Sequence, residues 1–177
     1  ASNIFERLPE IFFDQMPEDG NAYIKILGRS DNKRIYKYIR RDYVNDVDNL
    51  EYYKVLVPQA NGNGTFGEPI SQPVIEEPDV GNTETFISIG KFETKQEAID
   101  AGKYISTKFA RTLLSILKVT QNGNKPVWKM IPLQDFTPSS DIDWSKSVHE
   151  IDLQLYRKYG LDENEINFIE THVKEMA

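Results

Sequence analysis

The alternation of apolar and polar residues in the first third of the chain predicts β-strands. Residues 23–27 and 34–44 are rich in isoleucine and tyrosine, and residues 28–32 between them are rich in turn formers. Together these segments predict a hairpin. Residues 51–57 and 83–89 have a similar β-forming composition and predict two further strands.

A long amphipathic helix is predicted to follow these strands. Thr94 and Glu97 have the spacing of a capping box, so the helix is expected to run from Thr94 to about Val119, before Asn122 and Gly123. At about 100° per residue, its two faces differ in character. One face carries the apolar positions Ile99, Gly102, Ile105, Phe109, Leu113, Ile116 and Leu117. The other carries Lys103, Thr107, Arg111 and Lys118, with Lys108 at its margin. The pattern therefore predicts that one side packs and the other forms an exposed cationic ridge.

Two more capping patterns predict a pair of helices near the C-terminus. Ser147 with Glu150 opens a helix that is expected to end at Gly160, and Asp162 with Glu165 opens the next one. The short connection between them predicts a helical hairpin, whose apolar positions need another surface to cover them.

Two shorter segments complete the predicted fold. Residues 4–16 are apolar enough for a short helix, and residues 127–133 predict a short strand. The fold class is therefore α+β, with a small twisted antiparallel or mixed sheet, one long amphipathic helix and a C-terminal helical hairpin. We expect the β-rich part and its long helix to span residues 1–134, and the helical hairpin to span residues 135–177.

Charge is distributed unevenly along the chain. Residues 22–44 carry seven Lys and Arg against two Asp, and residues 85–134 carry eight against three acidic residues, so each segment has a formal charge of +5. The whole chain nevertheless has a formal charge of −7, because the remainder is strongly acidic. Segregated positive charge suits a polyanionic partner. The alternative is that these cations lie on solvent-facing strands and helix faces, where they only discourage aggregation.

The amino-acid composition favours a soluble globular domain over a membrane protein or a disulfide-rich secreted protein. A chain of 177 residues with 39% hydrophobic and 28% charged residues is typical of one soluble globular domain. The sequence contains no cysteine, which excludes disulfides and thiolate metal sites, and its two histidines, His149 and His172, fall on predicted helices. No apolar run is long enough to cross a bilayer and no secretion signal is recognisable, so we expect a cytoplasmic protein that does not contact membranes.

Strong catalytic motifs are absent from the sequence. There is no P-loop, and none of the patterns G-x-G-x-x-G, G-x-S-x-G and H-E-x-x-H occurs. Residues 78–79 and 93–95 have the letters of a metal-dependent nuclease, Pro-Asp followed by Glu-Thr-Lys. Thr94 is better explained as a helix cap, however, which places Lys95 on an exposed helical turn instead of a strand beside Asp79. We therefore expect no catalytic residue and no metal site in this chain.

Five short segments in a fixed order resemble a known family. They are KYISTKFAR at residues 103–111, KVTQN at 118–122, MIPLQDF at 130–136, DWS at 143–145 and LYRKYGL at 155–161. In this order they are similar to the C-terminal region of bacterial restriction-modification enzymes that carry an adenine-N6 DNA methyltransferase, over roughly residues 52–176. A helix followed by a strand ending in Pro-Leu-x-x-Phe is also similar to the recognition domains of separate DNA-specificity subunits.

The resemblance implies a target-recognition role. In that family this region chooses the DNA sequence, while a separate domain binds S-adenosylmethionine and transfers the methyl group. The methyltransferase signature, an Asn-Pro-Pro-Tyr-type loop with a glycine-rich cofactor motif, is missing from this sequence. The chain is therefore expected to be non-catalytic by itself and to hold no cofactor. It begins with alanine instead of an initiator methionine, which suggests an excised piece of a longer protein or a processed product.

The expected partner is double-stranded DNA, contacted through both phosphates and base edges. The candidates for phosphate contacts are Lys33, Lys37, Arg40, Arg41, Lys103, Lys108 and Arg111. The candidates for base edges are Gln59, Asn61, Asn63, Gln121 and Asn122. Arg29, Arg34, Thr107 and Lys118 complete the predicted DNA-binding set.

The main alternative is a protein-interaction module. In that interpretation the acidic C-terminal helices dock on the methyltransferase domain of the parent enzyme or on a partner subunit. The basic segments would then only keep the chain soluble.

Overall fold

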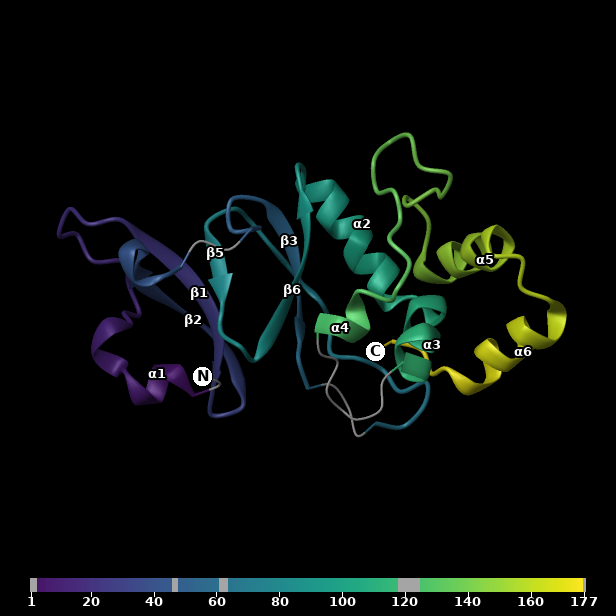
Figure 1. Cartoon of the computed structure of the whole chain (residues 1–177), viewed down its shortest axis with the longest axis horizontal. Coiled ribbons are helices and arrows are strands. Elements are labelled where there is room, and N and C mark those ends of the chain that lie inside the picture. The colour runs from purple at the N-terminus through teal and green to yellow at the C-terminus, as the bar shows by residue number, and fades with distance from the viewer. Residues whose placement is uncertain (1–2, 46–47, 61–63, 118–124, 177) are drawn as a thin grey trace.

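The computed structural model describes residues 3–45, 48–60, 64–117 and 125–176. Within these ranges the chain forms two three-stranded sheets and six α-helices, which confirms the predicted α+β class. The sheets occupy one half of the long axis of the molecule and most of the helices the other half (Figure 1).

The first sheet is built on the predicted basic hairpin. Strand β1 (Tyr23–Ser30) pairs antiparallel with β2 (Lys33–Arg40), and the short strand β5 (Val80–Asn82) runs parallel to β1 on its other side. The two-residue turn of the hairpin places Asp31 and Asn32 at φ angles of 48° and 59°. Asp and Asn tolerate this left-handed region better than most residues, and a two-residue turn of this type matches the twist of the flanking strands.

The second sheet is fully antiparallel. Strand β3 (Tyr53–Pro58) lies between β4 (Val74–Glu76) and β6 (Phe86–Phe92). The expected antiparallel or mixed sheet is thus present as two three-stranded sheets, one mixed and one antiparallel, which meet by side-chain packing. Two buried leucines, Leu27 of β1 and Leu56 of β3, form a small apolar cluster with Phe86 where the two sheets meet.

The long helix predicted from residue 94 is two helices. Helix α2 (Lys95–Ser106) begins with the predicted capping box of Thr94, and helix α3 (Lys108–Leu117) follows after a single residue. That residue, Thr107, has an extended backbone with φ −61° and ψ 151°. Its hydroxyl oxygen accepts a hydrogen bond from the Ala110 N–H at 3.1 Å, so it also caps α3. The expectation of one continuous helix is therefore wrong.

The C-terminal helical hairpin has the predicted form. Helices α5 (Val148–Lys158) and α6 (Glu163–His172) both begin with a complete capping box, at Ser147 and Asp162. Between them Gly160 adopts φ 67°, the left-handed value that commonly ends a helix. Local side-chain capping thus fixes where both helices begin.

The strand predicted at residues 127–133 is wrong. The short helix α4 (Lys125–Trp128) occupies its first part. The backbone N–H of Met130 then donates to the Val127 carbonyl at 3.1 Å, and Ile131 continues the turn. These local hydrogen bonds use backbone N–H and C=O groups that a β-strand would need for pairing with a neighbouring strand.

The main core joins the second sheet to the helices. Val55 of β3, Ile105 of α2, and Ile151 and Leu155 of α5 belong to one buried cluster. Members of this cluster come from both sides of the boundary predicted between residues 134 and 135. The helical hairpin therefore shares its core with the β-rich part.

A second buried cluster packs against one face of the hairpin strands. Helix α1 (Ile4–Arg7) lies across the first sheet (Figure 1), where Phe5 packs with Phe12, Ile24 and Ile39. Gly28 of β1 lies under the Phe5 ring, and any side chain there would collide with it. One face of the β1–β2 ribbon is thus packed against α1. The opposite face packs on the second sheet at Leu27 and is exposed toward the turn of the hairpin.

Candidate nucleic-acid interface

Strand pairing decides which side chains share the second face of the hairpin. Tyr23 lies opposite Arg40, Lys25 opposite Tyr38, Leu27 opposite Tyr36, and Arg29 opposite Arg34. Directly opposed residues of an antiparallel pair project to the same side of the sheet. The face they form, here called the cationic-aromatic face, consists of Tyr23, Lys25, Arg29, Arg34, Tyr36, Tyr38 and Arg40 together with the buried Leu27.

Cations and rings are in contact on the cationic-aromatic face. The Nζ of Lys25 lies 5.2 Å from the centre of the Tyr36 ring and 5.9 Å from that of Tyr38. The guanidinium of Arg34 lies 5.8 Å from the Phe86 ring of the second sheet. Such cation–π contacts orient charged groups without neutralising them.

The turn end of the hairpin gathers three exposed cations, Arg29, Lys33 and Arg34, here called the hairpin tip. Among the described residues none of the three forms an ion pair with a carboxylate. Arg29 donates only to the backbone carbonyl of Asn32, at 3.1 Å. Two arginines directly opposite each other repel, so the tip holds unfavourable positive charge that an anion would relieve.

The remaining cations of the first basic segment are partly compensated. Lys37 pairs with Asp14 at 2.7 Å, and Arg40 pairs with Asp42 at 2.6 Å. Arg41 donates to the Val44 carbonyl. These three predicted phosphate contacts therefore offer less free positive charge than the hairpin tip.

Tyr36 connects the cationic-aromatic face to the second sheet. Its hydroxyl donates a short hydrogen bond to the carboxylate of Glu76 on β4. Burial of the ring and this carboxylate both raise the pKa of Tyr36, so the phenol keeps its proton at neutral pH. Glu76 and Phe86 are members of this site that the sequence did not reveal, because each lies at least forty residues from its partner.

Three of the four described residues of the cationic ridge predicted on the long helix are not on the surface. Thr107, Lys108 and Arg111 are buried, with 0%, 6% and 2% of their surface exposed. Lys108 pairs with Glu170 and Glu175, both at 2.7 Å. The break at Thr107 turns this side of the helix toward the C-terminal segment, and these residues are unavailable to phosphate.

Arg111 is a structural residue. Its guanidinium donates to the backbone carbonyls of Ser106 at 3.2 Å, Glu68 at 3.4 Å and Lys174 at 2.6 Å. It thereby connects α3 to the end of α2, to the loop that contains Glu68 and to the C-terminal segment that contains Lys174. Burial lowers the pKa of Arg111, which still remains charged at any physiological pH.

Lys103 is the one described member of the predicted ridge that keeps appreciable exposure, and its charge is also engaged. Its ammonium donates to the Trp144 carbonyl at 2.5 Å and lies 3.9 Å from the carboxylate of Asp100. Lys103 therefore holds the segment before α5 against α2.

Most of the residues predicted to contact base edges lie outside the described residues. Asn61, Asn63, Gln121 and Asn122 lie outside the described residues, as does Lys118. Gln59 is described, and it lines a cleft of about 1000 Å³ between the two sheets. Lys54 in the wall of this cleft is buried and donates all three of its protons to backbone carbonyls, so it stabilises the fold.

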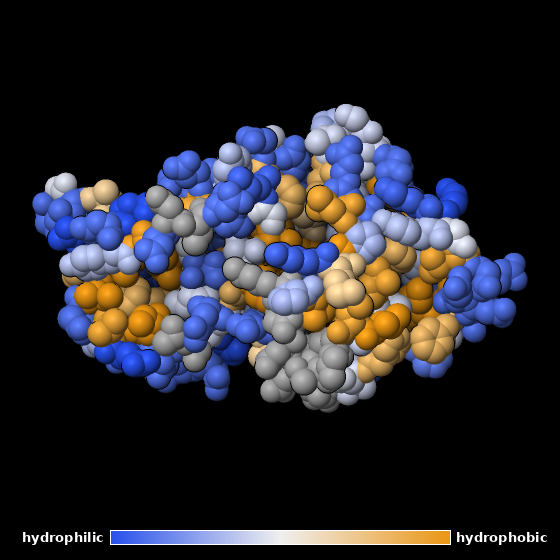
Figure 2. Space-filling model, in the orientation of Figure 1, coloured by the Kyte–Doolittle hydropathy of each residue, from blue (hydrophilic) through white to orange (hydrophobic). Residues whose placement is uncertain are grey.

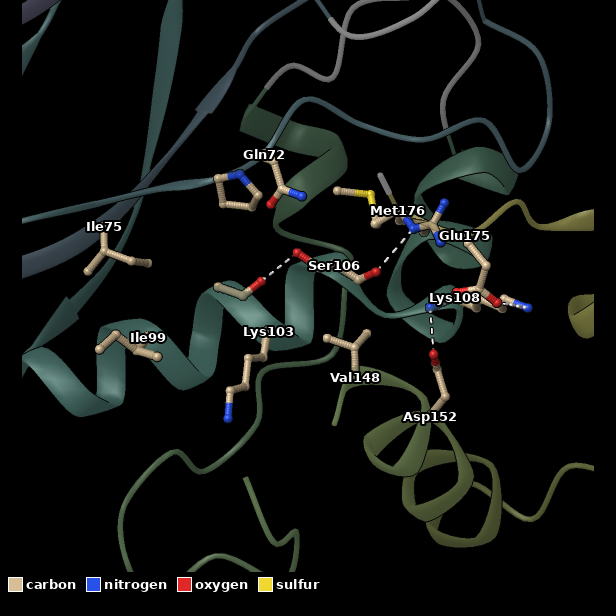
Figure 3. Close-up of a pocket in the computed structure, with 13 residues that line it drawn as sticks. Gln72, Ile75, Ile99, Lys103, Ser106, Lys108, Val148, Asp152, Glu175 and Met176 are labelled. Atoms are coloured by element: carbon tan, nitrogen blue, oxygen red, sulfur yellow. Dashed lines mark hydrogen bonds and ion pairs between the residues drawn. The ribbon is translucent and has the colours of Figure 1, made fainter. Parts of the chain in front are cut away.

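A smaller pocket of about 400 Å³ lies between α2, the start of α3 and α5 (Figure 3). Its polar groups already satisfy one another. The carboxylate of Asp152 accepts hydrogen bonds from the backbone N–H groups of Lys108 at 2.9 Å and Phe109 at 2.8 Å. Its cations, Lys103, Lys108 and Arg111, all have partners as described above. No charged group is left free in this pocket to bind a small ligand.

The described part of the chain holds no group of three or more His, Cys, Asp or Glu side chains placed to bind a metal ion. In the same residues, no helix combines the length and apolar character required to cross a membrane.

Comparison with known proteins yields no relative. No protein-family model matches the chain, and no curated protein or solved structure matches it. The geometry of the hairpin is therefore the basis for assigning a function.

Proposed function

We propose that this chain binds double-stranded DNA through the β1–β2 hairpin, as the target-recognition part of a restriction-modification methyltransferase. The observation that carries the proposal is the hairpin tip, where Arg29, Lys33 and Arg34 are exposed, close together and unpaired among the described residues. A cluster of this kind gains affinity for a polyanion because each phosphate contact releases about one counterion.

The shape of the site also suits DNA. The major groove is about 12 Å wide and admits a two-stranded β-ribbon. The β1–β2 ribbon has a tight two-residue turn and carries arginines on its solvent-facing side just behind that turn. Arginine suits both phosphates and guanine edges, since its planar guanidinium donates two parallel hydrogen bonds.

Positive and negative charge are concentrated in different parts of the molecule. The hairpin and the acidic helices α5 and α6 lie toward opposite ends of the long axis (Figure 1). A duplex approaching the hairpin is therefore kept away from the carboxylates of the C-terminal region. The described helical cations are not part of this proposal, because Lys108 and Arg111 are buried and Lys103 is engaged with Trp144 and Asp100.

The chemistry of methylation is assigned to another part of the parent enzyme. S-adenosylmethionine binding and methyl transfer would belong to that part, and this chain would supply the DNA contact. Its other proposed partner is accordingly the methyltransferase domain of the same enzyme or a partner subunit.

DNA titrations at several salt concentrations test the proposal. Fluorescence anisotropy with a labelled random-sequence 30-base-pair duplex should show binding whose log K falls linearly with log salt. Replacing Arg29 and Arg34 together by Gln should weaken binding roughly tenfold or more and reduce the slope by about 2, one unit for each lost phosphate contact. Arg157→Gln, an exposed arginine on α5, is the matched control and should leave both quantities unchanged.

Two results would remove the proposal. One is the absence of binding at about 20 mM salt, where electrostatic attraction is strongest. The other is equal binding by the double variant and the wild-type chain, provided both are folded.

A further inference from the structure

Helices α3 and α6 enclose an apolar groove that the DNA-binding proposal does not use. The groove has a volume of about 460 Å³. Phe109, Leu113 and Ile116 line it from α3, and Leu161 and Phe168 line it from the α6 side. The spacing of the α3 residues, at i, i+4 and i+7, makes the groove about two helical turns long. Figure 2 shows apolar side chains gathered over this part of the molecule.

Two large apolar side chains stand exposed in the groove. Ile116 is 66% exposed and Phe168 is 46% exposed. The Phe168 ring is held in place between Phe66, with ring centres 5.6 Å apart, and His172, with ring centres 4.2 Å apart. An aromatic ring that is fixed before binding loses little entropy on contact, which is a feature of strong anchoring residues.

The charged residues of α6, which forms one wall of the groove, are all glutamates. Asp162, Glu163 and Glu165 are exposed at the start of α6, and Glu165 lines the groove itself. Residues 159–173 contain no Lys or Arg. On α3, the cations Lys108 and Arg111 are buried and face away from solvent. The rim along α6 is therefore acidic with no compensating cation of its own.

The walls of the groove determine the form of an occupant. Both walls are helices, whose backbone groups are already bonded within each helix, so no free strand edge is available to pair with an extended peptide. An occupant must satisfy its own backbone, as a helix does. An apolar face that fits two turns of groove, flanked by cations that match the acidic rim, describes an amphipathic helix rich in Lys or Arg.

We propose that the groove between α3 and α6 is a protein-docking site for a basic amphipathic helix of a partner protein. The site is independent of the hairpin, and neither proposal requires the other. In this proposal the acidic C-terminal helices bind a protein, whereas the hairpin binds DNA.

A designed peptide tests this site directly on the full 177-residue chain. The probe is a labelled 18-residue helix of Leu and Lys with leucines at i, i+3, i+4 and i+7. Anisotropy should show that it binds at least tenfold more tightly than the same peptide with every Lys replaced by Glu. A peptide of identical composition with scrambled leucines should also bind at least tenfold more weakly, since net charge alone would not distinguish the two.

Surface variants locate the binding. Ile116→Ser should weaken the Leu-Lys peptide tenfold or more, whereas Met16→Ser, an apolar residue 58% exposed near the N-terminus, should not change binding. Glu163→Lys should weaken binding severalfold, whereas Glu10→Lys, an exposed glutamate elsewhere, should have no effect. Both tested side chains are exposed, so the fold is retained.

Three outcomes would overturn the proposal. Ile116→Ser could bind the peptide as tightly as the wild-type chain, or the Glu peptide could bind equally well. Alternatively, sedimentation could show that the chain forms a dimer that Ile116→Ser dissociates and the peptide does not displace. In that case the groove is occupied by a second copy of this chain.

Discussion

Arg29 and Arg34 lie directly opposite each other on neighbouring strands, both exposed and neither paired with a carboxylate among the described residues. Like charges placed opposite each other in an antiparallel pair are destabilising. A bound anion would relieve the repulsion between the two guanidinium groups, which is why we assign the pair to anion binding.

This pair predicts opposite effects on stability and binding. Arg34→Thr removes the repulsion and places a β-forming residue on an exposed strand, so the free energy of unfolding should rise by ~0.2–1 kcal/mol. DNA affinity should fall in the same variant. Urea unfolding and DNA titration measure the two quantities. A variant that loses stability instead would show that Arg34 supports the fold.

For the buried Arg111 we predict the opposite result, a loss of stability with no change in DNA affinity. Replacing it by Met leaves the carbonyls of Ser106, Glu68 and Lys174 without their donor, and the free energy of unfolding should fall by about 3 kcal/mol. The affinity of the remaining folded protein for DNA should not change. Arg157→Met is the exposed control and should stay within about 0.5 kcal/mol of the wild-type chain. Weaker DNA binding by folded Arg111→Met would contradict the structural role.

Asp152 predicts a distinctive pH dependence. Burial raises the pKa of Asp152 to about 6, although two backbone N–H groups favour its charged form. Because the folded state then binds a proton more tightly than the unfolded state, this group lowers the free energy of unfolding as pH rises from about 4 to about 6. The total change is on the order of 3 kcal/mol, and it is complete about one pH unit above the folded pKa.

A comparison with Asp152→Asn isolates this effect. The variant cannot titrate, so the pH-dependent difference in unfolding free energy between it and the wild-type chain should be confined to that window. An NMR titration of the Asp152 carboxyl carbon supplies a direct check. A midpoint below pH 4 would show that the hydrogen bonds to Lys108 and Phe109 outweigh burial.

The contact between Tyr36 and Glu76 predicts how firmly the hairpin is held. Tyr36→Phe removes the donor from a carboxylate that is only 6% exposed, and this should cost ~1–3 kcal/mol of unfolding free energy. Amide hydrogen exchange should also become faster in β2. Tyr43→Phe, at a tyrosine 56% exposed, is the matched control. Unchanged exchange in β2 would show that apolar packing alone fixes the hairpin.

Features encoded by short-range interactions were predictable from the sequence. The capping residues Thr94, Ser147 and Asp162 all bond to a backbone N–H three residues later, so the helix starts could be read directly. The basic hairpin was predictable for the same reason, since its turn and alternation are local.

Features that depend on distant partners were missed. Asp152, more than forty residues away, binds the first N–H groups of α3 and stabilises the break at Thr107. Arg111 is buried because the Lys174 carbonyl, near the other end of the chain, reaches it. Periodicity along a single helix carries no information about such contacts, and it therefore assigned buried cations to an exposed ridge. Among the described residues of the predicted site, Arg29, Lys33 and Arg34 of the hairpin are exposed, whereas Thr107, Lys108 and Arg111 are buried.

NMR titration of the whole chain with a duplex at low salt tests the central claim most directly. We predict that the amide signals of residues 29–34 shift as DNA is added, that these shifts shrink as salt is raised, and that signals from α5 and α6 stay in place. Shifts that spread over α2 and α3 but spare residues 29–34 would contradict the claim, as would the absence of any shift at about 20 mM salt.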